Sequence, residues 1–250
     1  MVLEKQEFNF FDTYPKFIIG KMMKHRERIS PAARLGTKTG YYGDLAATYE
    51  ERRFSGALGR LKNWKDQRIV RRAVRRAGHI QRVLDVPCGT GRFLQGLTGH
   101  VPYLVGADVS RDMIDFSRQH HRVKGGIAGR LEYVQCDAKY LPFGSNTFDL
   151  VVSGRFLHHL YHFPRAERIQ VIRELARVSQ KWVVGDFNMQ YGLKYYINKA
   201  RSILKGTQLK SQRMTAAKVF EELTEVGLQV EKVYPMSWFA SEKWYILCRK

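Results

Sequence analysis

The 250-residue sequence has few cysteines, few acidic residues and no long apolar run. Its three cysteines, Cys88, Cys136 and Cys248, are scattered without a Cys-x-x-Cys pair, so we expect reduced thiols and no metal site. No apolar stretch approaches the length that spans a bilayer, and the first residues lack the basic-then-apolar order of a secretory signal. These absences predict a cytoplasmic protein.

The charge balance is strongly basic. The 43 Lys and Arg against 23 Asp and Glu give a net charge of +20, more than solubility needs, which indicates an anionic partner or surface. Three interpretations remain open at this point. The arginines of residues 68–76 would follow the phosphates of RNA, or they would form a solvated helix face. Alternatively, the basic groups would bring the protein to an anionic membrane, with the aromatic and basic residues 8–28 as an interfacial anchor.

Apolar runs alternate with helical patterns along the chain, which predicts an α/β fold with a mostly parallel sheet and helices on both faces. The hydrophobic content of 44% over this length is enough to bury a sizeable core. The expected strands are residues 82–86, 103–107, 131–136, 147–153, 181–187, 228–234 and 243–249. The expected helices are residues 63–78, 91–98, 111–121, 165–178 and 215–226.

The segment 82–93 runs an apolar strand into a tight Gly-x-Gly turn that begins a helix. Gly89 and Gly91 lack Cβ atoms, so the backbone can adopt positive φ and approach a ligand, toward which the first N–H groups of the helix point. The third small residue of a dinucleotide fingerprint is absent, because Leu94 stands there. Asp85, just before the turn, would repel a pyrophosphate. The turn therefore predicts a small, nucleotide-like ligand that carries positive charge.

Two further acidic residues follow the next apolar runs. Asp108 closes the run 103–107, about 20 residues after the turn, at the place where ribose hydroxyls are usually held. Asp137 follows the run 131–136. Three successive predicted strands therefore lead into an acid.

In combination, these motifs resemble the class I S-adenosylmethionine-dependent methyltransferases over residues 45–250. The matching motifs are Val83-Leu84-Asp85-x-x-Cys88-Gly89-Thr90-Gly91, Gly106-Ala107-Asp108-x-Ser110-x-x-Met113, Asp137-Ala138 and Phe148-Asp149-Leu150-Val151, with Pro87 where many members carry glycine. The resemblance implies a Rossmann-like seven-stranded sheet, with the last two strands forming an antiparallel edge, and a methyltransferase domain at residues 61–250. It also implies S-adenosylmethionine as the cofactor.

The same resemblance implies roles for individual residues. Gly89 and Gly91 would line the methionine part of the cofactor, and Asp108 would bind the ribose diol. Met113 would pack on the adenine or belong to the helix core, and Asp137 would accept from the adenine amino group or shape a turn. The full set implied for cofactor binding is Tyr49, Arg53, Phe54, Asp85, Pro87, Cys88, Gly89, Gly91, Asp108, Val109, Met113, Asp137, Ala138, Gly154 and Arg155.

Two basic, aromatic regions lie outside the predicted core: an N-terminal extension, residues 1–60, and an insertion after the fifth strand, at about 188–214. Related enzymes close such segments over the active site, so both are lid candidates. Tyr49, Arg53 and Phe54 resemble a stretch that relatives place over the cofactor, where they would cover the sulfonium and pair with the methionine carboxylate. The alternative for this stretch is a solvated amphipathic helix.

A histidine cluster follows the fourth predicted strand. Methyl transfer from a sulfonium depends mainly on close approach in a dry pocket, and a base is needed only where the acceptor must lose a proton. His158 and His159 are the candidates because histidine titrates near neutral pH, although such a pair also packs structurally or contacts cofactor in the family. Arg155 would bind an anionic acceptor or pair with an acid of the protein.

The sequence shows no separate RNA-binding module and no Asn/Asp-Pro-Pro-aromatic motif for base amines, because the fourth strand leads into Ser153-Gly154-Arg155-Phe156. We therefore expect a methyltransferase for a small or lipid-linked, anionic acceptor, methylated on oxygen, with peripheral contact at an anionic membrane. An RNA methyltransferase is the alternative, and a non-catalytic cofactor-binding scaffold is the second alternative.

Overall fold

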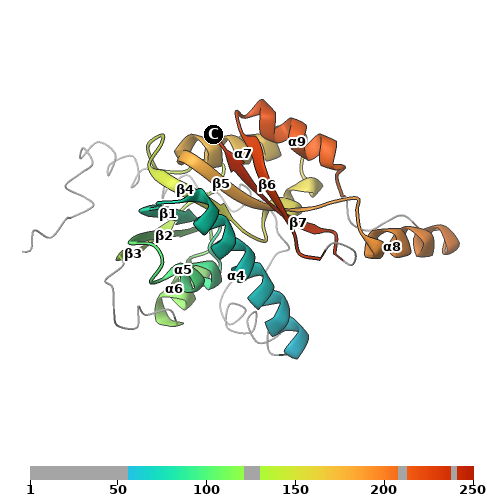
Figure 1. Cartoon of the computed structure of the whole chain (residues 1–250), viewed down its shortest axis with the longest axis horizontal. Helices are drawn as coiled ribbons and strands as arrows, with labels where there is room; N and C mark the ends of the chain where they lie inside the picture. Colours follow the sequence, from blue (N-terminus) through green and yellow to red (C-terminus); the bar gives the residue numbers. More distant parts are fainter. Residues whose placement is uncertain (1–55, 121–129, 208–212, 238–240) are drawn as a thin grey trace, which may run out of the picture. The chain divides into compact units, whose positions relative to one another are not determined.

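A seven-stranded sheet organises the described part of the chain, which comprises residues 56–120, 130–207, 213–237 and 241–250 of this computed structural model (Figure 1). Its strand order is β3-β2-β1-β4-β5-β7-β6. The strands are β1 Arg82–Asp85, β2 Tyr103–Asp108, β3 Arg130–Gln135, β4 Phe148–Ser153, β5 Ser179–Asn188, β6 Gln229–Pro235 and β7 Lys243–Arg249. Strands β1 to β5 are parallel, and β7 runs antiparallel to both β5 and β6. The predicted Rossmann-like sheet is confirmed, with β7 lying inside the outermost strand β6.

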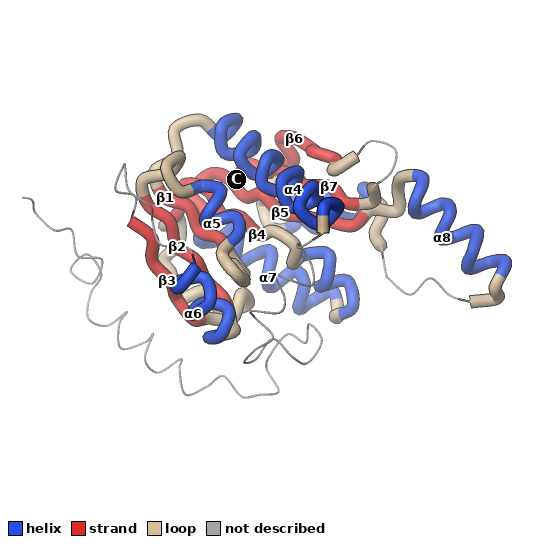
Figure 2. The backbone as a smooth tube through the Cα atoms, turned by 90° about the horizontal axis from the view of Figure 1, so that it is seen from below, coloured by secondary structure: helices blue, strands red, loops and turns tan. Residues whose placement is uncertain are grey.

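Helices cover both faces of the sheet, as predicted. Figure 1 shows α7 and α9 on one side and α4, α5 and α6 on the other, and Figure 2 shows the second group from below. None of the helices in the described ranges combines the length and apolar character that crossing a membrane requires. The helices are α4 Ala57–Ala77, α5 Arg92–Leu97, α6 Arg111–His120, the 3-10 helix η2 Leu157–His162, α7 Arg165–Val178, α8 Leu193–Leu204 and α9 Ala216–Glu225.

Two α-helices differ from the sequence expectation, and the 3-10 helix η2 was not expected either. Helix α4 begins at Ala57, six residues earlier than expected, because its first turns are exposed and carry no buried apolar pattern. Helix α8 lies in the predicted insertion, whose two ends are joined by a parallel bridge between Met189 and Met214. The domain division near residue 60 and the lid roles stay predictions.

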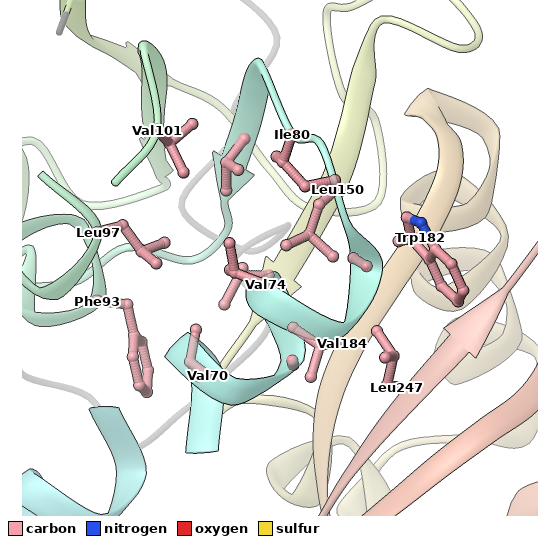
Figure 3. Packing of buried hydrophobic residues seen from close by; sticks show 14 of the residues in the cluster. Val70, Val74, Ile80, Phe93, Leu97, Val101, Leu150, Trp182, Val184 and Leu247 are labelled. Carbon is pink, nitrogen blue, oxygen red and sulfur yellow. The ribbon is translucent and has the colours of Figure 1, made fainter. Parts of the chain in front are cut away.

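The core on the α4 side follows from the helical and strand periodicities. Helix α4 turns Val70 and Val74 inward, and they pack in one buried cluster with Phe93 of α5 and with Leu150 and Val184 of the sheet (Figure 3). Burying one such side chain fully stabilises a fold by about 1.5–3 kcal/mol. The arginines at positions 72, 75 and 76 lie on the exposed face of the same helix. This arrangement is that of an amphipathic helix with a solvated basic face.

The amino edge of the sheet is separate from the predicted ligand site. Here Asp149 Oδ2 accepts hydrogen bonds from the backbone N–H groups of Gln81 and Arg82, both at 2.8 Å, and thereby fixes the start of β1. An open cavity of about 520 Å³ lies at this edge, with His79 and Lys181 in its lining. The motif residue Asp149 thus has a structural partner far from the turn that follows β1.

Candidate functional site

The turn between β1 and α5 lies at the carboxyl edge of the sheet and is fastened to both neighbouring strands. The backbone N–H of Val86 donates to a carbonyl of β4 (2.9 Å), and that of Cys88 donates to a carbonyl of β2 (2.8 Å). Gly89 and Gly91 have φ values of +53° and +80°, which favour glycine. A Cβ atom at Gly89 would meet no atom of the described residues within 4 Å, so among them the backbone is open to a ligand.

Asp108, the last residue of β2, joins this turn to the next loop. Its Oδ2 accepts from the backbone N–H of Gly89 (2.8 Å), and its Oδ1 accepts from that of Ser110 (2.9 Å). Burial raises the pKa of Asp108 above its ordinary value, although the N–H groups of Ser110 and Gly89 act in the opposite direction. Each carboxylate oxygen has two lone pairs, so Asp108 retains capacity to accept from hydroxyl groups.

Asp85, the last residue of β1, is a fully buried acid. Neither of its carboxylate oxygens has a hydrogen-bond partner among the residues that the structure describes. Burial raises the pKa of Asp85 well above its ordinary value, Arg92 opposes this, and Asp108 adds to it. Because a buried carboxylate without a partner is costly, a cationic ligand at this edge would stabilise it.

The residues predicted for the adenine end lie on α6 and after β3. Met113 is buried in α6, and the carbonyl of Val109 accepts from Gln135 Nε2 (3.1 Å). Asp137 Oδ1 accepts from the backbone N–H of Lys139 (2.8 Å), an Asx turn of the kind that the sequence offered as the alternative to an adenine contact. The adenine roles of these residues stay predictions.

Gly154 and Arg155 have structural partners within the protein. A Cβ on Gly154 would lie 2.2 Å from Cε2 of Phe93, so glycine allows α5 to pack against β4. Arg155 Nη1 lies 3.6 Å from Oδ2 of Asp66 on α4, a buried acid that also accepts from the hydroxyl of Tyr245 (2.8 Å). Of the two roles that the sequence left open for Arg155, binding an anionic acceptor or pairing with an acid of the protein, the structure shows the second.

His158 lies beside two charged residues that the sequence analysis did not single out. Its Nδ1 is 2.8 Å from Oδ2 of Asp186 on β5, and Nζ of Lys243 on β7 is 2.9 Å from the same oxygen. Oδ1 of Asp186 accepts from the backbone N–H of Phe156 (3.0 Å). Asp186 is fully buried. The ring of His159 packs against that of His158, with centroids 4.0 Å apart.

The charge on Asp186 follows from these contacts. Burial alone would raise the pKa of Asp186, but the neighbouring Lys243 and His158 outweigh burial and lower the pKa below its ordinary value. An ionised Asp186 favours the His158 tautomer with the proton on Nδ1, which leaves Nε2 as the ring nitrogen able to accept a proton. An acid within the apolar strand 182–187 is the sequence signal that would have identified Asp186, whereas Lys243 carries no comparable signal.

Part of the predicted site lies outside the described residues. Tyr49, Arg53 and Phe54, with the rest of residues 1–55, belong to this part. Within the described ranges, the structure brings together Asp85, Gly89 and Asp108 at the ends of two adjacent strands. The predicted bases lie beyond β4 and beside β5.

A family profile described as a methyltransferase domain matches residues 83–181. The ubiquinone/menaquinone biosynthesis C-methyltransferase UbiE of Ectopseudomonas oleovorans is 36% identical over 127 residues, which cover 50% of this chain and 68% of that protein. The 27-O-demethylrifamycin SV methyltransferase of Amycolatopsis mediterranei (strain S699) is 28% identical over 213 residues, 82% of this chain and 71% of that protein. The chain spans about half the length, or less, of several other curated relatives that it matches.

Solved structures show the same architecture. The crystal structure of magnesium protoporphyrin IX methyltransferase from Synechocystis PCC 6803 with bound SAH has a TM-score of 0.65 at 16% identity, covering 82% of this chain and 94% of that one. A likeness at this identity shows the shared fold. The 36% identity to the UbiE relative, of which the alignment covers 68%, together with the matching profile shows that this chain belongs to the class I S-adenosylmethionine-dependent methyltransferase family.

Proposed function

We propose that this protein binds S-adenosylmethionine at the carboxyl edge of the sheet and methylates a hydroxyl group of a small acceptor, with His158 as general base. The observation that supports this assignment most strongly is the buried Asp186, which lies 2.8 Å from His158 Nδ1. Methyl transfer to a carbon or nitrogen that is already nucleophilic would have no use for an oriented base.

The residues around the β1 turn fit the cofactor. Bound S-adenosylmethionine supplies an electrophilic methyl group on a positively charged sulfur. The buried carboxylate of Asp85, which accepts no hydrogen bond from the described residues, would balance positive charge of the methionine part, through water or backbone amides. Asp108 would accept from ribose hydroxyls while the open backbone at Gly89 allows close approach.

The base would act through its second ring nitrogen. His158 Nε2 would take the proton of the acceptor hydroxyl as the oxygen becomes nucleophilic, and Asp186 would stabilise the resulting imidazolium. Lys243 keeps Asp186 ionised before this proton arrives. A positioned base typically contributes about 10²–10⁴ in rate. Holding the acceptor close to the methyl donor in a dry pocket would supply the rest of the rate acceleration.

The name of one relative supports an acceptor that carries a hydroxyl group, and the name of another indicates transfer to carbon. One is named a C-methyltransferase of quinone biosynthesis and another a methyltransferase of an O-demethylated rifamycin. A base that ionises a phenolic hydroxyl serves both outcomes, because negative charge then reaches the oxygen and the neighbouring ring carbons. We propose oxygen as the atom and a small or lipid-linked, anionic acceptor, presented at an anionic membrane.

Two variants test the base. The full chain, S-adenosylmethionine and a panel of quinols and phenols would be assayed by mass spectrometry of the products, with fragmentation to locate the methyl group. His158→Gln should lower kcat by about 100-fold or more, because the base is lost. His162→Gln is the matched control, since His162 is exposed at the end of the same short helix.

Cofactor affinity separates the outcomes. Calorimetry with S-adenosylhomocysteine should give the same affinity for His158→Gln and wild type, because the base does not hold the cofactor. Turnover by His158→Gln at the wild-type rate would contradict the assignment. Cofactor binding without turnover on any acceptor would favour the scaffold alternative.

A further inference from the structure

Helix α8, in the predicted insertion, exposes an unusual number of large apolar side chains. Leu193, Tyr196, Ile197, Ile203 and Leu204 are between 40% and 86% exposed. At 100° per residue these five positions fall within an arc of about 120° on one side of the helix. We call this set the apolar arc. Single exposed apolar residues are ordinary on soluble proteins, but a continuous arc along one helix marks an interaction surface.

Along the sequence, the charged residues on both sides of the apolar arc have a single sign. Residues 187–220 contain seven Lys and Arg and no Asp or Glu. Among them, Lys199, Arg201 and Lys205 are exposed and lie outside the arc. An apolar stripe bordered by basic residues without acids is the composition of helices that lie in the interface of anionic bilayers.

We propose that α8 docks on an anionic lipid bilayer, with the apolar arc in the headgroup region and the basic residues against lipid phosphates. A second copy of the chain fits this surface less well, because pairing two arcs would bring their basic borders together. Long basic side chains can instead reach from the border of the arc to the lipid headgroups while their stems remain on apolar surface.

The position of α8 along the chain links this contact to the site. Strand β5 carries Asp186 and ends at Asn188, and α8 begins at Leu193. Five residue steps span at most about 18 Å, so the helix starts near the carboxyl edge of the sheet. Docking would therefore bring the region of His158 close to the bilayer. The membrane contact is inferred from the side chains of α8 alone. Only the delivery of a lipid-linked acceptor to the site rests on the proposed function.

Vesicle sedimentation tests this surface with the full chain. The vesicles would be phosphatidylcholine with 30% phosphatidylglycerol, and phosphatidylcholine alone. Ile197→Gln/Leu204→Gln interrupts the apolar arc without changing charge. Asn198→Gln/Ser202→Gln is the matched control, because it places the same two side chains on the opposite side of the helix. Circular dichroism would verify that both variants fold.

We expect the wild-type protein to bind the anionic vesicles, more weakly at high salt and on neutral lipid. The arc variant should lose about tenfold or more of its partition coefficient, because two apolar side chains no longer enter the bilayer, and the control should bind as the wild type does. The proposal would be overturned by absent binding, by equal binding of the arc variant, or by a dimer that this variant dissociates. Unchanged S-adenosylhomocysteine affinity in the arc variant separates this result from the proposed function.

Discussion

Asp85 and Asp186 are both fully buried near the carboxyl ends of parallel strands, but their surroundings are opposite. Asp186 contacts Lys243, His158 and a backbone N–H group, all contributed by the protein itself. Asp85 has no hydrogen-bond partner among the described residues. The protein's own residues stabilise the charge of Asp186 before any ligand binds. The buried carboxylate of Asp85 instead indicates where a ligand of positive charge would be accommodated.

The two environments predict opposite dependences of stability on pH. The pKa of Asp186 is lowered, so its contribution to stability is present above the unfolded value of about 3.9 and is lost as the pH falls through the folded pKa. The pKa of Asp85 is raised, so the folded chain binds more protons there than the unfolded chain does. Its contribution therefore declines as the pH rises from about 3.9 toward the folded pKa.

The largest effect is expected from Asp186→Asn. Removing this buried carboxylate leaves the positive charge of the half-buried Lys243 without its partner, and breaking a buried pair costs about 3–5 kcal/mol in the free energy of unfolding. Urea denaturation at neutral pH measures this loss. A loss below about 1 kcal/mol would show that the Asp186 cluster contributes no more than an exposed pair.

A smaller effect is expected from Gly154→Ala, a change of packing after β4, the strand between β1 and β5. The added Cβ would collide with Phe93, and overpacking of this kind costs about 1–3 kcal/mol. S-adenosylhomocysteine affinity should change little, because the collision is with a core ring. A large loss of affinity with intact stability would instead place Gly154 in the cofactor pocket.

The smallest effect is expected from Asp85→Asn, and it has the opposite sign. Removing a buried charge that accepts no hydrogen bond from the described residues should raise the free energy of unfolding of the ligand-free protein by about 1 kcal/mol at pH 8. The gain should shrink as the pH falls toward about 3.9, because the folded and unfolded wild-type chains then differ less in the protons they bind at Asp85. Urea denaturation across this pH range measures it, and a destabilised variant would mean that Asp85 has a partner in the free protein.

The fold was largely predictable from the sequence because most strands are short apolar runs bounded by turn residues. All seven predicted strands are present, with bounds that differ by at most two residues at either end. Helix α8 was not predicted, because the insertion at about 188–214 was interpreted only as a basic, aromatic lid candidate and its helical spacing of apolar residues was not used. Asp85, Gly89 and Asp108 could be identified because one βαβ unit fixes their spacing.

The residues that surround His158 and Arg155 could not be identified from spacing along the sequence. Asp66 on α4, Asp186 on β5 and Lys243 on β7 come from distant parts of the chain, and only the packed sheet brings them to His158 and Arg155. Spacing along the sequence carries no information on such contacts. The one local signal in the sequence is an acidic residue inside an apolar run, and it applies to Asp186, which the structure shows to be buried.

Titration calorimetry of the full chain and of Asp85→Asn with S-adenosylmethionine and S-adenosylhomocysteine is the most direct test. We predict micromolar binding to the wild-type protein, about 8 kcal/mol in free energy. Binding to Asp85→Asn should be weaker by about 1.5–3 kcal/mol, or roughly 10–150-fold, because a charge-assisted interaction is lost. No binding to the wild-type protein, or equal affinity in the variant, would contradict a cofactor site built around Asp85.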